Sequence, residues 1–238
     1  MTTTTAIIMA TDTPMDNGSL YRLMTWLSPS FPVGAFTYSH GLEWAVEEGA
    51  IHDRESLTAW LTDLLELGGG WSDAVLFRNA YQSAAAGDWD AFDEAAELAL
   101  ALGPTRERRM ETVQQGKAFI LATRATWPWS VADAPRFDGD VAYPVAVAAV
   151  AAGHGVPPEP ALHAYLHAFA GNLISAGVRA IPLGQTDGQR ALAALEPVVA
   201  GVCERALAAG LDQVGGAAFL SDIASMKHET QYTRLFRS

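Results

Sequence analysis

Apolar residues in this chain recur three and four positions apart, the spacing of one face of an α-helix, and this periodicity constrains the fold most. The clearest case is "DRESLTAWLTDLLELGGG", residues 53–70, where Asp53 stands as an N-cap and three glycines end the pattern. The stripe consists of Leu57, Trp60, Leu61, Leu64 and Leu65. Convincing strands that alternate Val, Ile or Thr with polar residues are absent. The sequence therefore predicts an all-α protein.

Similar patterns, bounded by Pro and Gly, place the other helices. They are expected near Ser19–Leu27, His40–Glu48, Ser72–Ala86, Trp89–Leu102, Thr105–Thr126, Tyr143–Ala152, Glu159–Arg179 and Gln185–Ala209. Their faces are rich in alanine, which lets helices approach closely, and no internal repeat points to a solenoid. We expect a single compact bundle of about eight to ten helices, in which Trp127–Asp140 is a surface loop.

Composition excludes several classes of protein. The single cysteine, Cys203, allows neither an internal disulfide nor a multi-thiolate metal site, which fits a reducing compartment, and we expect a cytoplasmic location. No apolar run approaches the roughly 20 residues that span a bilayer. The net charge is −12, and residues 1–103 carry 15 acidic but only 3 basic side chains. Such a surface repels nucleic acid and favours basic protein patches or cations.

Motifs of covalent chemistry are missing. The sequence contains no GxxxxGK[ST] or GxGxxG phosphate loop, and neither HExxH nor GxSxG. Ser39 and His40 are adjacent, but neighbouring side chains on a helix point about 100° apart, whereas a nucleophile and its base must meet in space. These absences favour a protein that is not an enzyme.

One helical pattern would suit a metal ion. In "EPALHAYLH", Glu159, His163 and His167 recur every four residues and would lie on one helix face. The alternative is that these histidines pack or form hydrogen bonds within a helix interface. The other histidines, His40, His52, His154 and His228, have no carboxylate–histidine cluster near them in the sequence.

The end of the chain has the composition of a binding segment. "FLSDIASMKHETQYTRLFRS" lacks a clean helical stripe and places apolar side chains beside guanidinium groups, as protein interfaces do. Either it orders on a partner or it docks on its own core. Arg179 suits the C-terminus of its helix, and it could also join the run Arg106–Arg109 in contacting an acidic or nucleotide-binding partner.

Four blocks, "LSPSFPVGAFTYSHGLE", "ERRMETVQQGKAF", "HAFAGNLISAGVRAIPLGQTDGQR" and "DIASMKHETQYTRLFRS", closely resemble the urease accessory protein F (UreF) family, and the resemblance runs from about Leu20 to Ser238. It implies an all-helical, cytoplasmic homodimer that helps to load nickel into apo-urease. Such a protein binds urease accessory protein D or H and recruits the nickel-carrying GTPase, urease accessory protein G, which it regulates. No tightly bound cofactor is implied, and nickel contact would be transient.

Composition and resemblance together predict a flexible tail at 1–18, a helical domain at 19–220 and a partner-binding tail at 221–238. It implies that Pro29, Pro32 and Gly34 shape a rigid turn leading into a recognition surface, and that Arg179 contacts the GTPase. The expected partner-binding residues are Pro29, Pro32, Gly34, Phe36, Tyr38, Glu43, Arg179, Tyr232, Arg234, Leu235, Phe236 and Arg237. Two alternatives remain: direct nickel binding by Glu159, His163 and His167, or GTPase activation by an arginine finger from Arg179, Arg234 or Arg237.

Overall fold

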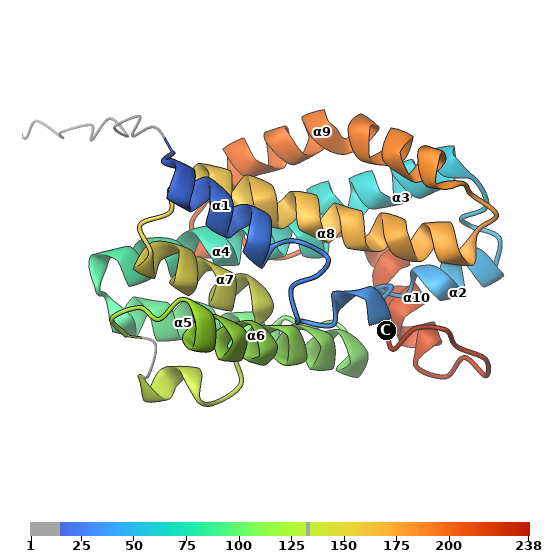
Figure 1. The fold of residues 1–238 in the computed structure, drawn as a ribbon. Helices are drawn as coiled ribbons and strands as arrows, with labels where there is room; N and C mark the ends of the chain where they lie inside the picture. Colours follow the sequence, from blue (N-terminus) through green and yellow to red (C-terminus); the bar gives the residue numbers. More distant parts are fainter. Residues whose placement is uncertain (1–14, 132–133) are drawn as a thin grey trace, which may run out of the picture.

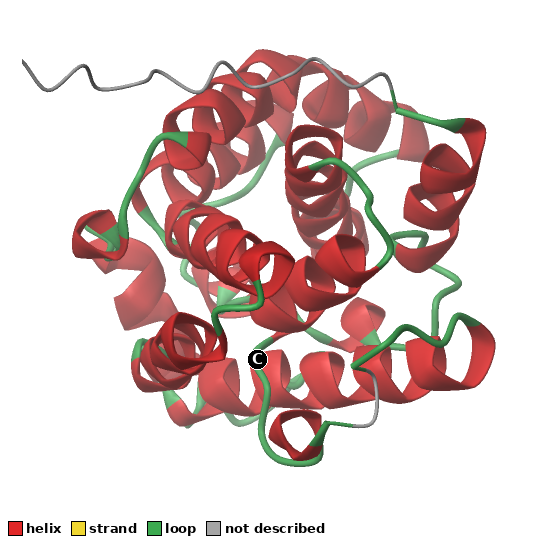
Figure 2. Ribbon diagram, turned by 90° about the vertical axis from the view of Figure 1, so that its left-hand side faces the viewer, coloured by secondary structure: helices red, strands yellow, loops and turns green. Residues whose placement is uncertain are grey.

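A computed structural model describes residues 15–131 and 134–238, and within them it contains helices and loops but no strand (Figures 1 and 2). The predicted all-α bundle is confirmed. Its α-helices are α1 (Asn17–Trp26), α2 (Leu42–Glu47), α3 (Arg54–Leu67), α4 (Gly69–Ala86), α5 (Trp89–Ala101), α6 (Arg106–Thr126), α7 (Tyr143–Gly153), α8 (Pro158–Ala180), α9 (Gln185–Leu207) and α10 (Phe219–His228). Short 3₁₀ helices occupy Ala35–Thr37, Pro135–Phe137 and Leu211–Gln213.

Side-chain caps fix several helix starts where the sequence offers Asp or Thr. The carboxylate of Asp53 accepts a hydrogen bond from the backbone N–H of Ser56 at 2.8 Å, as expected of an N-cap. The backbone N–H of Asp53 in turn donates to the Ser56 hydroxyl, which completes a capping box. Thr105 caps α6 in the same way through the N–H of Arg108, at 3.2 Å. These local hydrogen bonds explain why the predicted boundaries of α3 and α6 agree closely with the structure.

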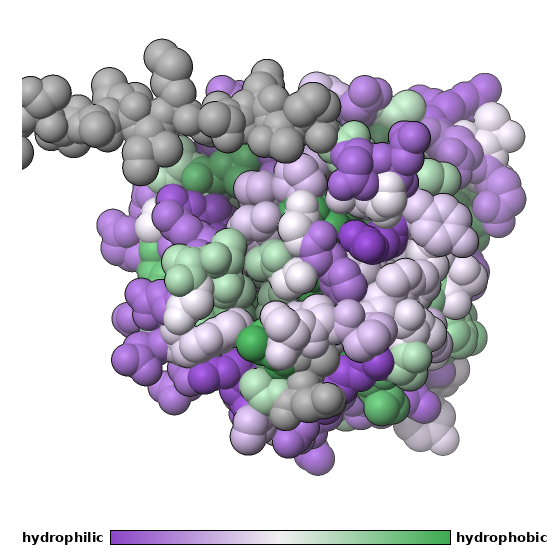
Figure 3. Space-filling model, turned by 60° about the vertical axis from the view of Figure 1, so that its left-hand side comes forward, coloured by the Kyte–Doolittle hydropathy of each residue, from purple (hydrophilic) through white to green (hydrophobic). Residues whose placement is uncertain are grey.

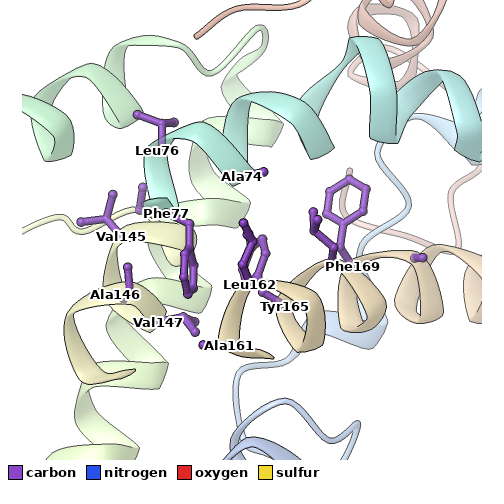
Figure 4. Close-up of a cluster of buried hydrophobic side chains, with 14 of the residues drawn as sticks. Ala74, Leu76, Phe77, Val145, Ala146, Val147, Ala161, Leu162, Tyr165 and Phe169 are labelled. Carbon is purple, nitrogen blue, oxygen red and sulfur yellow. The ribbon is translucent and has the colours of Figure 1, made fainter. Parts of the chain in front are cut away.

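The core is organised around α7, which is buried on all sides from Pro144 to Ala151 and packs against α4 and α6. Figure 4 shows Val145, Ala146 and Val147 of α7 beside Phe77 of α4. Small residues let the backbones approach: a Cβ added to Gly116 of α6 would lie 2.0 Å from the carbonyl oxygen of Val141. The alanine-rich faces therefore serve close helix packing.

The predicted surface loop, Trp127–Asp140, is anchored more firmly than the sequence suggested. Two of its aromatic side chains are buried, Trp129 at 8% exposure and Phe137 at 4%, with their rings 6.1 Å apart. The ring of Trp129 also lies against the Gly153 backbone, where a Cβ would meet it at 2.4 Å. These two side chains therefore belong to the hydrophobic core.

Helix α10 was not anticipated, and it crosses the expected boundary at residue 221. Its inward face is small and polar, formed by Ser221, Ala224, Ser225 and His228, and it packs against α2. Its large apolar residues face solvent: Phe219, Leu220, Ile223 and Met226 are 68%, 72%, 46% and 52% exposed. Figure 1 shows α10, α2 and the C-terminus together at one end of the molecule.

The N-terminal expectation falls largely on residues 1–14, which lie outside the described chain; α1 begins at Asn17, inside the predicted tail. None of the described helices combines the length and the apolar character that crossing a membrane requires. Figure 3 shows a face on which hydrophilic and hydrophobic residues are intermixed.

Candidate functional site

The loop that precedes α2 presents side chains in two directions. Gly34 has φ +74°, a left-handed conformation, and starts the 3₁₀ turn that follows. Phe36 on this turn is 62% exposed, whereas Tyr38 is buried and donates its hydroxyl to the side chain of Gln114 at 2.7 Å. Pro29 and Pro32 are exposed. The loop thus anchors itself through Tyr38 and leaves Phe36 in solvent.

Residues 229–238, here called the terminal segment, dock on this loop through their backbone. The N–H groups of Leu235 and Phe236 donate to the carboxylate of Glu43 at 2.7 and 3.0 Å. The N–H of Arg237 donates to the carbonyl of Thr37 at 2.8 Å, and Ser238 accepts from the Ser39 N–H at 2.8 Å. The Phe236 side chain is only 4% exposed. The segment therefore docks on its own core, one of the two alternatives that its composition left open.

A buried histidine joins this docking site to α10 and α6. His228 is completely buried, with Nδ1 2.7 Å from Glu107 and Nε2 3.2 Å from Glu43. Each ring nitrogen of His228 therefore faces a carboxylate from a different helix, α6 on one side and α2 on the other. Glu107 also pairs with Arg234 of the terminal segment at 2.6 Å. Removing one partner would leave buried charge without compensation.

A second charged group lies beside the first. Glu111 of α6 accepts from His40 at 2.8 Å, from Ser238 at 2.8 Å and from Arg108. Burial alone would raise the pKa of Glu111, but Arg108, His40 and the hydroxyl of Ser238 outweigh it and lower that pKa to about 2. Burial lowers the pKa of His40, and the nearby Arg108 lowers it further. Glu111 raises this pKa, but the lowering effects are larger. Glu111 is therefore a fixed anion at neutral pH.

Beside these groups lies a partly open pocket of about 270 Å³, whose polar lining residues include His40, Asp73, Arg108, Asp222 and Ser225. Asp73 accepts the hydroxyl of Tyr165 at 2.7 Å, and burial raises the pKa of Asp73 to about 6. Helix α10 contributes Ser221, Asp222 and Ser225 to the wall of the pocket. The inner face of α10 is polar where it borders this pocket.

Arg179 connects α8 to the docked segment. Its guanidinium donates to the carbonyl of Phe36 at 2.6 Å, and its Cζ lies 4.5 Å from the ring centroid of Phe236. It also donates to the Ser175 carbonyl at 3.1 Å, within the last turns of α8. Arg179 therefore does more than interact with the end of its own helix. It contacts both the loop, at Phe36, and the terminal segment, at Phe236.

The structure gathers most of the predicted partner-binding residues at one site. Glu43, Arg179 and Phe236 form its framework, and Phe36, Leu235 and Arg237 are exposed on it. Tyr232 is fully exposed and has no hydrogen bond in the described chain. The run Arg106–Arg109 does not act as one cationic patch, because Arg108 turns inward to Glu111 and Arg109 bonds the carbonyl of Leu100.

Sequence reasoning missed the polar framework of the site. It found no carboxylate–histidine cluster around His40 or His228 along the chain, whereas the fold supplies Glu111 to the first and Glu43 and Glu107 to the second. These pairs are separated by 71, 185 and 121 residues. The one available signal was that all of these side chains fall in the four quoted blocks.

The helical Glu-His-His pattern does not form a preformed metal centre. Within the described residues, no three His, Cys, Asp or Glu side chains are arranged to hold a metal ion. His163 and His167 line a hollow between α8 and α9, but Glu159 is not part of its lining.

Comparison with known proteins identifies the family. The family model described as UreF matches residues 51–196. The chain is 53% identical to the urease accessory protein UreF of Bradyrhizobium sp. (strain BTAi1 / ATCC BAA-1182), over 97% of both chains. It is 57% identical to that of Rhodopseudomonas palustris (strain BisB5), over 93% of this chain and 92% of the relative. These matches extend well beyond the family-model region, and the chain belongs to the UreF family of urease accessory proteins.

Proposed function

We propose that this protein is a non-enzymatic adaptor in urease maturation, which binds urease accessory protein D or H and recruits and regulates the GTPase, urease accessory protein G, during nickel insertion into apo-urease. In this proposal it acts in the cytoplasm as a homodimer. The observation that carries the proposal is the docked terminal segment: its backbone and Phe236 are fixed, while Leu235 and Tyr232 are 73% and 103% exposed. Exposed apolar anchors on a rigid support suit protein recognition, since little conformational entropy is lost on binding.

The outward face of α10 supports the same conclusion. Its exposed Phe219, Leu220, Ile223 and Met226 form an unusual apolar surface for a helix that packs its polar face inward. Apolar area of this kind marks interaction sites. We assign this face and the terminal segment to the D or H partner, and the guanidinium of Arg179 with its neighbour Phe36 to the GTPase.

The contacts of two of the three candidate arginines, Arg179 and Arg234, favour an adaptor over an arginine finger. Arg234 is paired with Glu107, and Arg179 is held by Phe36 and Phe236. An arginine finger must reach the transferring phosphoryl group, so both side chains would first have to break these contacts.

The test is a light-scattering experiment on a size-exclusion column with the D or H partner and then the nucleotide-loaded GTPase. We expect stepwise assembly, which Leu235→Ala weakens by about tenfold, as removal of an interface anchor commonly does. Leu121→Ala is the matched control, because Leu121 on α6 is 71% exposed against 73% for Leu235. Equal effects of the two substitutions, or separate elution of folded partners, would overturn the proposal.

A further inference from the structure

The pocket beside the His40–Glu111 pair has no role in the proposed adaptor function. It has a volume of about 270 Å³, is partly open to solvent, and is lined by residues of α3 to α7 and of α10. That volume is close to the lower limit of pockets that hold small organic ligands, about 300 Å³. Its charged and imidazole side chains are His40, Asp73, Arg108 and Asp222, and leucine, proline and serine residues line much of the rest.

The charged groups that line this pocket are unequally paired. Among the described residues of its wall, Arg108 is the one permanent cation, and its guanidinium already pairs with Glu111. Asp73 accepts a hydrogen bond from the Tyr165 hydroxyl, at 2.7 Å. The Asp222 carboxylate has no hydrogen bond or ion pair to any residue that the structure describes. Within those residues, neither aspartate therefore has a cation of its own.

Burial acts on both aspartates without a compensating charge. It raises the pKa of Asp73 to about 6, and it also raises the pKa of Asp222. Arg108 lowers both pKa values, but by less than burial raises them. A carboxylate in this environment is stabilised when a cation approaches, because the cation replaces the hydration that burial removes.

His40 adds a third acceptor, and its position is fixed. It is only 8% exposed, and its Nε2 lies 2.8 Å from Glu111. Glu111 is an anion at neutral pH and can only accept, so Nε2 carries the proton. Because burial lowers the pKa of His40, the ring is neutral and Nδ1 is an acceptor, which has no hydrogen bond within the described residues. Of those residues, His40 is also the one non-glycine with a positive φ, +56°, a strained conformation typical of functional sites.

We propose that this pocket binds a small organic cation with ammonium or guanidinium groups, whose N–H groups donate to Asp73, Asp222 and Nδ1 of His40. Such groups carry hydrogen-bond donors and no acceptor, so they match a pocket whose unpaired charged groups are carboxylates. The leucine and proline side chains of the wall suit the carbon chain of the ligand. In the described part of the chain, no three His, Cys, Asp or Glu side chains are arranged to hold a metal ion, which favours an organic cation here.

The test is an NMR titration of the full chain, with isotope-labelled histidine, by agmatine, which carries a guanidinium and an ammonium group on one aliphatic chain. We expect the Nδ1 signal of His40 to shift, because its lone pair gains a hydrogen bond, while the signals of the exposed His52 stay unchanged. Glutarate, a dianion of similar length, should cause neither shift. Asp73→Asn and Asp222→Asn should each weaken agmatine binding by about tenfold, the loss expected when a charged acceptor becomes neutral. Asp63→Asn, at an exposed position of α3, is the matched control and should leave binding unchanged.

The ionisation of Asp73 gives a second measurement. The titratable and charged groups around it are Tyr165, Arg108, Glu111, His40 and Asp222. Raising the pH through about 6 ionises Asp73, so the affinity for agmatine should rise over this range. The rise should be smaller in Asp73→Asn, in which the other groups, His40 among them, still titrate.

The same experiments can overturn the proposal. It fails if glutarate binds as tightly as agmatine, or if the Asp73→Asn and Asp222→Asn variants both keep wild-type affinity. It also fails if the signals of His52 shift as much as those of His40, because agmatine would then be attracted to the acidic surface in general. Light scattering with the protein partners, without any added cation, tests the adaptor function separately.

Discussion

At the scale of single residues, two acids near the same cavity show how partners decide ionisation. Glu111 has an arginine, a histidine and a serine hydroxyl around it, and its pKa falls to about 2 despite burial. Asp73 has as its hydrogen-bond partner the Tyr165 hydroxyl, and burial raises its pKa to about 6. Charge is therefore stabilised at Glu111 and disfavoured at Asp73. The two groups should affect stability in opposite pH ranges.

Replacing Asp73 with asparagine tests this difference. The folded pKa of Asp73 lies above the unfolded value, so its favourable contribution is complete below about pH 4 and is lost as the pH rises through about 6. At pH 8 the wild type carries the cost of a poorly solvated carboxylate, which Asp73→Asn removes while it can still accept from Tyr165. We expect the variant to be more stable than wild type by about 2 kcal/mol at pH 8 and equal to it near pH 4.

Scanning calorimetry at the two pH values measures the effect, which corresponds to a rise in Tm of about 4–8 °C at pH 8 for a chain of this size. Asp63→Asn, at an exposed position of α3, is the control and should change little at either pH. A variant that is destabilised at pH 8 would show that the charge of Asp73 is needed in the fold.

At the scale of elements, the sequence predicts α1 to α9 from apolar residues at helical spacing and from the Pro, Gly and capping residues that bound them. It fails for α10 for a physical reason: Phe219, Leu220, Ile223 and Met226 face solvent, and the buried face consists of Ser221, Ala224, Ser225 and His228. A prediction from hydrophobic periodicity assigns the apolar positions to the buried face of a helix. The inverted helix is recognisable only when its polar partners on α2 and α6 are placed beside it. The same distance in sequence hid Glu107 and Glu111 from the predicted site.

The contact between α10 and the start of α2 depends on one glycine. Gly41 has φ +75°, and a Cβ there would lie 2.5 Å from the backbone nitrogen of Ser225 in α10. Gly49 has a similar φ, +78°, but a Cβ there meets nothing within 4 Å. Gly49→Ala should therefore cost only the left-handed backbone strain, about 1–2 kcal/mol. Gly41→Ala should cost that amount and about 2 kcal/mol more, because α10 must move.

Urea unfolding gives the free energy of unfolding of both variants. Both substitutions strain a left-handed backbone, but only Gly41→Ala adds a clash with α10. Hydrogen exchange should show faster exchange of α10 amides in Gly41→Ala only. Equal destabilisation of the two variants would mean that α10 does not depend on this close approach.

At the scale of the whole molecule, the terminal segment ties together elements that are distant in sequence. Its backbone bonds reach Glu43 of α2 and the loop at Thr37 and Ser39, and its side chains reach Glu107 and Glu111 of α6. The sequence predicted the tail residues of this site from composition and resemblance. It did not predict their docking, because each contact joins residues more than 100 positions apart, such as Glu43 and Phe236 at 193.

Removal of residues 229–238 tests how far this segment acts as a binding element and how far as a structural one. None of α1 to α10 includes these residues, so the helical signal in circular dichroism should be preserved. Binding of the D or H partner should fall by at least about 100-fold, which is about 2.7 kcal/mol, because the exposed anchors Tyr232 and Leu235 are lost with the segment. Loss of the helical signal would mean that the segment is needed for folding. Full partner binding by a chain that keeps its helices would instead place the recognition surface elsewhere on the bundle.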